Sequence, residues 1–265
     1  MKRILAILTA IVSAFVILSV SGCDDKGGKE YIGIISAMDK EIEVLIENAD
    51  IEKVETVGGE KYHVGTLCGK NVIITKSGIG KVRASSGVTT MFNTYNISKL
   101  IFTGVAGGVA DETEVLDEIV ATRVLEHDYG IRTNDGFIWR SGDPGIGDTP
   151  GEYYYCDKDL VDIAYNAAVE VVGNDHAYMG TIATGDQFIA SEEYVNYLKT
   201  EYDAYACEME GAAVAAICIK YQIPFVVIRA LSDKADGNAH ESYDNFIDIA
   251  GGNSCRIVMK FLKSL

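Results

Sequence analysis

Proline, paired cysteine motifs and positive charge are all scarce in this chain. Only three prolines occur among 265 residues, against 27 glycines, while 48% of the residues are hydrophobic and 23% are charged. This composition excludes a disordered or collagenous chain and is typical of one globular α/β domain. The sequence contains no CxxC motif and no cluster of Cys and His, so we expect no zinc site.

Basic residues are outnumbered by acidic ones. The chain has 23 Lys and Arg against 39 Asp and Glu, which gives a formal net charge of −16. Lys2 and Arg3 are the only charged residues before Cys23, so the chain without that segment carries −18. Such a charge repels polyanions. We therefore expect no nucleic acid partner, and no direct binding to an anionic membrane surface.

The first 22 residues have the pattern of an export signal. A basic start precedes an uncharged, apolar stretch over residues 4–20, and small residues lead up to Cys23. We predict a lipoprotein signal peptide at 1–22, with a lipid on Cys23 and a polar tether over 23–30. The protein would then be exported and anchored to a bacterial membrane only through that lipid. An uncleaved membrane-spanning helix is the alternative, because the apolar stretch is close to the minimum spanning length.

Five cysteines follow the predicted lipidation site, at positions 68, 156, 207, 218 and 255. Exported proteins usually pair their cysteines, but an odd number cannot all pair within one chain. We therefore expect buried free thiols.

Short β-rich runs alternate with stretches of helical spacing along the rest of the chain. The predicted strands are residues 31–35, 72–75, 100–103, 118–125, 179–184 and 225–231, and the predicted helices are residues 39–47, 158–172, 192–199 and 209–221. This alternation predicts a largely parallel sheet covered by helices. No internal repeat or second linker divides the chain, so we expect one domain over 31–265. Residues 127–155, rich in Gly, Asp and aromatics, are predicted to form a long loop or lid.

Small or acidic residues follow four of the apolar runs, at strand ends where ligands gather in open α/β sheets. Glu41 follows the first run, and residues 103–108 (TGVAGG) form a small-residue turn. Glu208 and Glu210 lead into an Ala-rich helix, and Asp233 ends the last apolar strand. Taken singly, these acids have structural explanations: a helix-dipole charge, a helix cap or a surface position. Together, they indicate a catalytic site at one sheet edge.

Six segments extend this pattern: 32–41 (IGIISAMDKE), 76–81 (KSGIGK), 103–108 (TGVAGG), 184–189 (TGDQFI), 208–210 (EME) and 229–233 (RALSD). In order and spacing they resemble the bacterial methylthioadenosine/S-adenosylhomocysteine nucleosidases. The resemblance extends from about residue 31 to residue 265. It implies a single-domain, three-layer α/β fold of the nucleoside phosphorylase type, with a mostly parallel, twisted, mixed central sheet. It also implies a homodimer, no metal, no organic cofactor, and hydrolysis of the bond between adenine and a 5'-thio-substituted ribose.

The resemblance also assigns roles to individual residues. Glu41 matches the base that activates water, Asp233 the acid that protonates adenine at N7, and Glu210 the carboxylate that holds the ribose hydroxyls. The other implied substrate-binding residues are Met209 against the sugar, Phe188 stacked on adenine, Ile189 at the adenine edge, Gly107 in the pocket turn, Tyr243 on the 5' side, and Glu208, Arg229 and Ser232 in supporting positions. Val105 stands where many members have Ser, which weakens the expectation of one polar contact near the ribose.

Other functions stay open at the level of sequence. A purine nucleoside phosphorylase would share the fold but needs cations around its phosphate, and residues 39–41 offer two acids and one Lys. A futalosine-type nucleoside hydrolase would differ only in substrate. A non-catalytic nucleoside-binding surface lipoprotein would not need the three carboxylates that are present. Methylthioadenosine, S-adenosylhomocysteine and 5'-deoxyadenosine are all candidate substrates of the nucleosidase.

Overall fold

A twisted mixed sheet forms the centre of the computed structural model, which describes residues 28–139 and 153–265. Its strands are β1 (Tyr31–Ser36), β2 (Asp50–Val57), β3 (Glu60–Leu67), β4 (Lys70–Lys76), β5 (Ile97–Gly108), β6 (Glu118–Glu126), β9 (Tyr154–Tyr155), β10 (Ala177–Thr184), β11 (Ala204–Glu208) and β12 (Phe225–Asp233). The α-helices are α2 (Glu43–Asn48), α3 (Lys81–Thr94), α4 (Lys158–Val172), α5 (Glu192–Tyr202), α6 (Gly211–Tyr221) and α7 (Ala239–Ser264), and two 3-10 turns are η1 (Asp39–Glu41) and η2 (Asn174–His176). A separate hairpin consists of β7 (Gly130–Thr133) and β8 (Gly136–Trp139).

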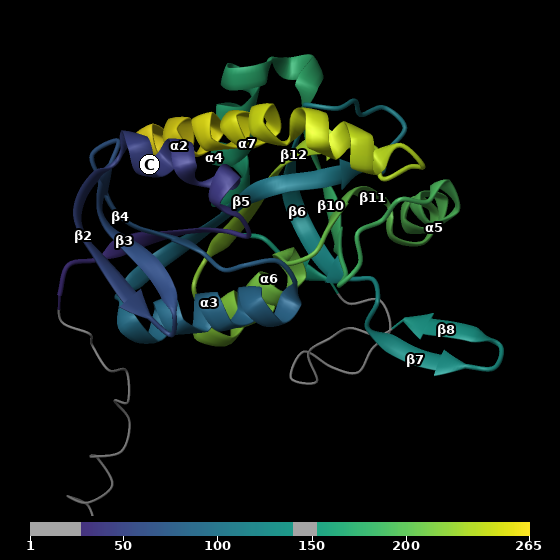
Figure 1. The fold of residues 1–265 in the computed structure, drawn as a ribbon, viewed down its shortest axis with the longest axis horizontal. Coiled ribbons are helices and arrows are strands. Elements are labelled where there is room, and N and C mark those ends of the chain that lie inside the picture. The colour runs from purple at the N-terminus through teal and green to yellow at the C-terminus, as the bar shows by residue number, and fades with distance from the viewer. Residues whose placement is uncertain (1–27, 140–152) are drawn as a thin grey trace, which may run out of the picture.

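The strands follow the order β11-β10-β6-β12-β5-β1-β4-β3-β2 (Figure 1). The central strands β4, β1, β5 and β12 run parallel to one another, whereas β2, β3 and β4 form antiparallel hairpins. The long strand β5 also pairs at its end with β11, where Gly107 faces Cys207. The half of the sheet from β5 to β11 therefore curls back on itself. Strand β12 is buried at all nine positions, which explains its continuous apolar run.

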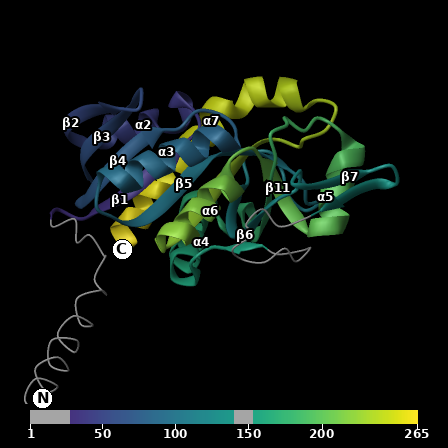
Figure 2. The same ribbon diagram turned by 90° about the horizontal axis from the view of Figure 1, so that it is seen from below.

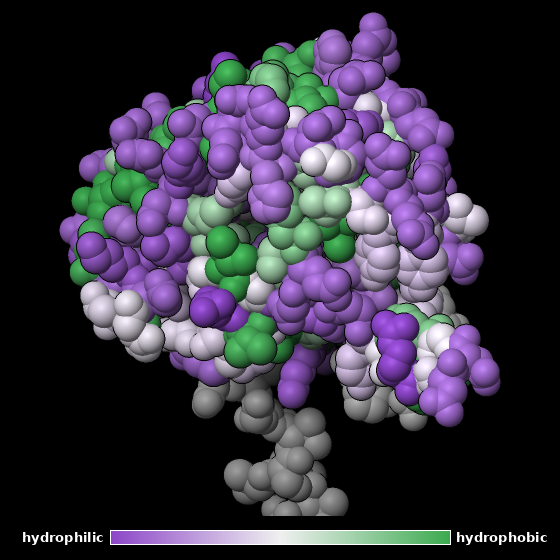
Figure 3. Space-filling model, turned by 45° about the vertical axis from the view of Figure 1, so that its right-hand side comes forward, coloured by the Kyte–Doolittle hydropathy of each residue, from purple (hydrophilic) through white to green (hydrophobic). Residues whose placement is uncertain are grey.

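Helices cover both faces of the sheet. Helix α7 lies on one face with α4 packed against it, while α3 and α6 pack together on the opposite face (Figures 1 and 2). This arrangement confirms the predicted three-layer α/β fold. The face shown in Figure 3 is mainly hydrophilic, with smaller hydrophobic patches between the polar side chains.

Side-chain caps and left-handed residues set the ends of several helices. Asp157 accepts a hydrogen bond of 3.1 Å from the Leu160 amide at the start of α4, and Ser191 caps α5 in the same manner. Helices α5 and α6 end where Asp203 and Gln222 take φ values of 53° and 57°. The predicted strands and the predicted helices over 158–172, 192–199 and 209–221 are confirmed, with small changes at their ends.

One predicted helix is interrupted. Residues 39–47 were expected to be continuous, but residues 39–41 form the turn η1 and α2 begins only at Glu43. Ile42 separates them with φ −125° and ψ −10°. The cause is local: the Glu41 carboxylate turns back to accept the Met38 amide, so the chain tightens around that side chain instead of extending as a helix.

The prediction of a long loop over 127–155 is wrong in its described part, because the chain there forms the β7–β8 hairpin and the short strand β9. The Trp139 indole anchors the hairpin by donating to the Glu126 carbonyl. Residues 140–152 lie outside the described residues, as do the predicted signal peptide and Cys23. No helix within the described ranges is both long and apolar enough to cross a membrane. The five downstream cysteines are free, as expected; Cys68 is only partly buried, and the others are buried.

Candidate active site

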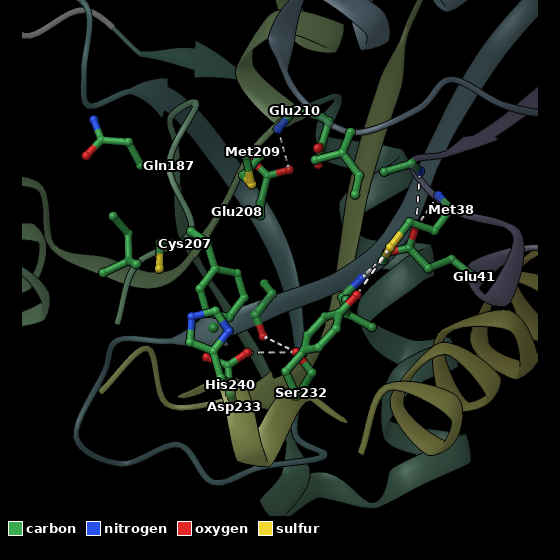
Figure 4. Close-up of a pocket in the computed structure, with 18 of the residues that line it drawn as sticks. Met38, Glu41, Gln187, Cys207, Glu208, Met209, Glu210, Ser232, Asp233 and His240 are labelled. Atoms are coloured by element: carbon green, nitrogen blue, oxygen red, sulfur yellow. Dashed lines mark hydrogen bonds between the residues drawn. The ribbon is translucent and has the colours of Figure 1, made fainter. Parts of the chain in front are cut away.

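A cavity of about 380 Å³ opens at the carboxyl edge of the sheet. Its walls come from the end of β1 with η1, the end of β5, the loop after β10, the β11–α6 junction, and the end of β12 with the first turns of α7. The predicted site residues that line it are Glu41, Gly107, Phe188, Ile189, Glu208, Met209, Glu210, Ser232, Asp233 and Tyr243. Figure 4 shows Glu41 and Asp233 on different walls of this one cavity.

Glu41 is buried and held from several directions. Its Oε2 atom accepts hydrogen bonds from the Ser36 hydroxyl at 2.7 Å, the Met38 amide at 2.8 Å and the Ala37 amide at 3.1 Å. Among the residues that the structure describes, its Oε1 atom accepts only from the Val105 amide, at 2.9 Å. Burial raises the pKa of the Glu41 carboxyl above its usual range, against the opposing effect of a nearby guanidinium and of these donors. Because Oε1 has the fewer donors, it is the atom left free to accept a proton from a water molecule.

Val105 contributes its backbone amide, not its side chain, to the hydrogen bonds of the site. The side chain at this position is apolar, but its backbone donates directly to Glu41. The preceding Gly104 leaves room for this contact, since a Cβ atom there would lie 2.5 Å from Oε1 of Glu41. The small-residue turn of 103–108 therefore accommodates the buried carboxylate.

Asp233 lies at the opposite end of the site, on the last residue of β12. Its Oδ1 accepts from the Ala235 amide at 2.8 Å, and its Oδ2 lies 2.9 Å from the Ser232 hydroxyl. Burial raises the pKa of the Asp233 carboxyl, although both donors act in the opposite direction. The carboxyl does not cap α7, which begins at Ala239. The helix-cap explanation is therefore wrong, and the group is left facing the cavity.

Glu208 and Arg229 form a buried pair behind the cavity. Arg229 Nη2 donates to Glu208 Oε2 at 2.7 Å, and both side chains are almost fully excluded from solvent. The same carboxylate accepts the Thr184 hydroxyl and the amides of Glu210 and Gly211. Its acceptor capacity is used by the protein, so Glu208 holds the start of α6 in place. Arg229 does not line the cavity.

Glu210 is placed by that junction and by the loop after β4. Its Oε1 accepts the Gly80 amide at 2.8 Å, and burial together with the neighbouring Glu208 raises the pKa of its carboxyl. Lys81 ties the same loop to the end of β6 through ion pairs with Glu126 at 2.9 Å and Asp128 at 2.7 Å. The loop that donates to Glu210 is therefore held by partly buried charges.

Aromatic rings form the rim of the cavity. Phe188 is 42% exposed and stacks on His240, with ring centroids 4.5 Å apart and an angle of 19° between the planes. Tyr243 meets Phe188 edge-on at 5.9 Å and donates from its hydroxyl to Met38 Sδ at 3.2 Å. One face of the Phe188 ring is thus covered by protein, which leaves the other for a planar ligand.

Sequence reasoning missed several lining residues, including His240, Met38, Ile79, Gln187, Cys207 and Asp244. His240 could be placed beside Tyr243 only once α7 was known to be a helix, because residues three positions apart share a helix face. Cys207 carries no comparable signal, since an apolar strand position gives the same pattern whether it faces the core or a ligand.

The lining contains no Lys or Arg among the residues that the structure describes. No group of His, Cys, Asp or Glu within residues 28–139 and 153–265 is arranged to hold a metal ion. The described walls thus carry carboxyl groups, one His, one carboxamide, hydroxyl groups and a thiol, together with apolar side chains, but no cationic Lys or Arg.

The arrangement of two carboxyl groups around a cavity beside a stacking ring agrees with the comparisons to known proteins. The family model described as "Phosphorylase superfamily" matches residues 31–263. A 5'-methylthioadenosine/S-adenosylhomocysteine nucleosidase of Bacillus cytotoxicus is 38% identical over 236 residues, which cover 88% of this chain and 99% of that protein. The chain belongs to this nucleosidase family of the phosphorylase superfamily.

Solved structures of family members have the same fold. The nucleosidase of Neisseria meningitidis, solved in complex with methylthio-immucillin-A, aligns with a TM-score of 0.79 and 32% identity, covering 90% of this chain and 100% of that one. The futalosine hydrolase of Helicobacter pylori aligns with a TM-score of 0.78 and 31% identity, covering 89% and 98%. The nucleoside phosphorylase-type fold is therefore confirmed, and the two hydrolases share it.

Proposed function

We propose that this protein hydrolyses the N-glycosidic bond of 5'-methylthioadenosine and S-adenosylhomocysteine, releasing adenine and the 5'-thioribose. The observation that carries the proposal is that Glu41 and Asp233 line one cavity although they come from opposite ends of the chain. The nucleosidase relatives support the choice of substrate.

Asp233 acts as the acid. Adenine is a poor leaving group as an anion, so a proton must reach N7 as the glycosidic bond stretches. A carboxyl whose pKa is raised by burial holds that proton closer to neutral pH than an exposed Asp would. The Ala235 amide donates to Oδ1 and the Ser232 hydroxyl donates to Oδ2, so both oxygens of the acid are held in place at the cavity wall.

Glu41 acts as the base toward water. As the bond breaks, the sugar becomes oxocarbenium-like, and a water molecule must attack from the face opposite adenine. The Oε1 atom of Glu41 accepts the water proton, while the Ala37 and Met38 amides hold Oε2 in place. Glu210 holds the ribose hydroxyls and stabilises the developing positive charge by its own negative charge.

The described lining favours water over phosphate as the nucleophile. A phosphorylase needs cations around the phosphate, and the described residues provide no Lys or Arg there. The futalosine hydrolase of Helicobacter pylori has the same fold, so a substrate assay has to separate the futalosine alternative.

Product chromatography tests the proposal. The purified domain is incubated separately with methylthioadenosine, S-adenosylhomocysteine, 5'-deoxyadenosine and futalosine, each with and without phosphate. We expect adenine and free thioribose from the first two, at a rate independent of phosphate. A phosphate requirement with a sugar phosphate product would show a phosphorylase, and bound nucleoside without free adenine would show a binding protein.

We further propose a homodimer in which the partner covers the cavity mouth. Apolar side chains are exposed near the start of α3, at Ile79 and Val82, and on the β7–β8 hairpin, at Ile131 and Ile138. Ile79 also lines the cavity. Lys81 pairs with Glu126 and Asp128, which precede the hairpin along the chain. Light scattering of the purified domain should give twice the chain mass, and Val82→Glu should reduce it to one chain.

The third proposal concerns the cell location. A lipid on Cys23 would anchor the exported domain, whose charge of −18 provides no attraction of its own to anionic lipid. Mass spectrometry of the amino-terminal peptide from the membrane fraction should show diacylglycerol on Cys23. An intact Met1 start in that fraction would contradict both cleavage and lipidation.

A further inference from the structure

Ser36, the last residue of β1, shares its hydroxyl between two acceptors. Its Oγ atom lies 2.7 Å from Glu41 Oε2 and 2.6 Å from the Thr103 carbonyl oxygen of β5. The side chain is completely buried. A hydroxyl carries only one hydrogen, so it can donate to one of these oxygens at a time.

The charge of Glu41 decides which acceptor receives the hydrogen. An ionised carboxylate is a stronger acceptor than an amide carbonyl, so Ser36 donates to Oε2 when Glu41 is ionised. Once Glu41 has taken a proton from water, its remaining oxygen is a weaker acceptor than the Thr103 carbonyl. The Ser36 hydrogen then turns to Thr103, and no atom heavier than hydrogen has to move.

We propose that Ser36 is a positioning residue for the water-activating base, whose hydroxyl follows the protonation of Glu41 by switching between Oε2 and the Thr103 carbonyl. The inference rests on the proposed function of Glu41. Ser36 is not among the residues that line the cavity. The family resemblance gives it no role either.

The acid has a similar arrangement. Ser232 Oγ lies 2.9 Å from Asp233 Oδ2 and 3.3 Å from the Ala106 carbonyl, which also belongs to β5. During the reaction Glu41 gains a proton while Asp233 loses one. The two hydroxyls therefore turn in opposite senses, each toward the carboxyl that is ionised at that moment.

Other charged or titratable groups face the two carboxyls and stay unchanged in the serine variants. Around Glu41 they are Arg229 of β12, Glu210 after β11, and Tyr243 and Cys255 of α7.

Around Asp233 the corresponding groups are Asp236 and His240 near the start of α7, Tyr243 on that helix, and Cys207 of β11. Because the two environments share only Tyr243, a change at one serine is expected to affect one carboxyl.

The test is the pH profile of kcat/KM for adenine release. Activity requires Glu41 ionised and Asp233 protonated, so Glu41 sets the acid limb and Asp233 the alkaline limb. Ser36→Ala removes a donor to the ionised base, and we expect the acid limb to move up by about half to one pH unit while the alkaline limb stays. Ser36→Cys keeps the shape with a weaker donor and should give a smaller shift.

Two matched variants make the result decisive. Ser77→Ala removes a buried hydroxyl that contacts the Ser36 carbonyl at 3.2 Å but neither carboxyl, and should move neither limb. Ser232→Ala should move the alkaline limb alone. An unshifted acid limb in Ser36→Ala, or an equal fall in rate at every pH, would overturn the switching role. Absence of adenine release by the unaltered protein would instead overturn the proposed function.

Discussion

Three carboxyl groups of the same chemical type have different environments in this site. Glu41 is surrounded by four donors and Asp233 by two, whereas Glu210 accepts a hydrogen bond from the Gly80 amide. Burial raises the pKa of each, but the number of donors decides how strongly the ionised form is held. The residue that must be ionised as base has the most donors, and the residue that must carry a proton has fewer.

Another buried acid lies away from the cavity. Both oxygens of Glu118, at the start of β6, are buried without a hydrogen-bond partner. Burial and the neighbouring Asp117 raise the pKa of Glu118 well above its usual range, with only Arg256 opposing. The folded protein therefore binds a proton that the unfolded chain releases near pH 4.5, and stability falls as pH rises from there toward the raised folded pKa.

Glu118→Gln should remove this dependence. At pH 8 we expect the free energy of unfolding of the variant to exceed that of the unaltered protein by about 1 kcal/mol, so that the variant unfolds at a higher temperature. At pH 4 we expect little difference between the two proteins. Thermal unfolding across this range measures it, with the exposed Glu47→Gln as control. An equal effect of Glu118→Gln at both ends of the range would contradict the argument.

At the scale of elements, helix α7 supports the segment that carries the base. A Cβ atom at Gly251 would lie 3.0 Å from the Lys40 carbonyl, whereas one at the adjacent Gly252 would meet nothing within 4 Å. The Cys255 thiol also donates to the Glu41 carbonyl at 3.1 Å. The backbone of η1 is therefore fixed by α7 as well as by β1.

The two neighbouring glycines provide a matched pair of variants. Gly251→Ala should push η1 outward and lower kcat for adenine release by about tenfold or more, since small displacements of a catalytic group have large effects. Gly252→Ala should keep activity and stabilise the fold by about 0.5–1 kcal/mol, because Ala replaces Gly inside a helix. Steady-state kinetics and thermal unfolding check both; equal kcat in the two variants would refute the support by α7.

Lys81 similarly supports the part of the cavity wall where the Gly80 amide donates to Glu210. Its ammonium and both carboxylate partners are about 15% exposed, so Lys81→Met leaves Glu126 and Asp128 partly buried without a counter-charge. We expect a loss of about 1–3 kcal/mol in stability after allowing for solvent screening, and a higher KM because the Gly80 amide shifts from Glu210. Lys158→Met, which breaks an exposed ion pair, should change neither by a comparable amount. An unchanged KM in Lys81→Met would show that the Lys81 ion pairs do not position the residues around Glu210.

At the scale of the whole molecule, the alternation of apolar runs predicted the α/β architecture because buried strands and amphipathic helices have distinct periods. It did not indicate the β2–β3 hairpin, whose outer strand β2 lies at the edge of the sheet, is mostly polar and has no buried position. Nor did it indicate α7, where Gly251 and Gly252 weaken helix propensity and tertiary packing decides. Local patterns carry little information where long-range packing determines the structure.

The same distinction applies to the site. Glu41, Glu210 and Asp233 could be identified because each follows an apolar strand, and parallel strands bring such ends together. Ser36 could not, because a buried serine in a strand has no sequence feature that shows which atom it faces. The pairing of β5 with β11, which closes the pocket beside Gly107, likewise depends on contacts between segments about 100 residues apart.

The central claim is that Glu41 and Asp233 perform the two proton transfers across one nucleoside. The most direct measurement is the rate of adenine release from methylthioadenosine by Glu41→Gln and Asp233→Asn, with nucleoside binding measured on the same samples. Each variant should bind the nucleoside and lose about 10²–10⁴-fold in rate. Release at a near-normal rate by either variant, with binding intact, would contradict the account.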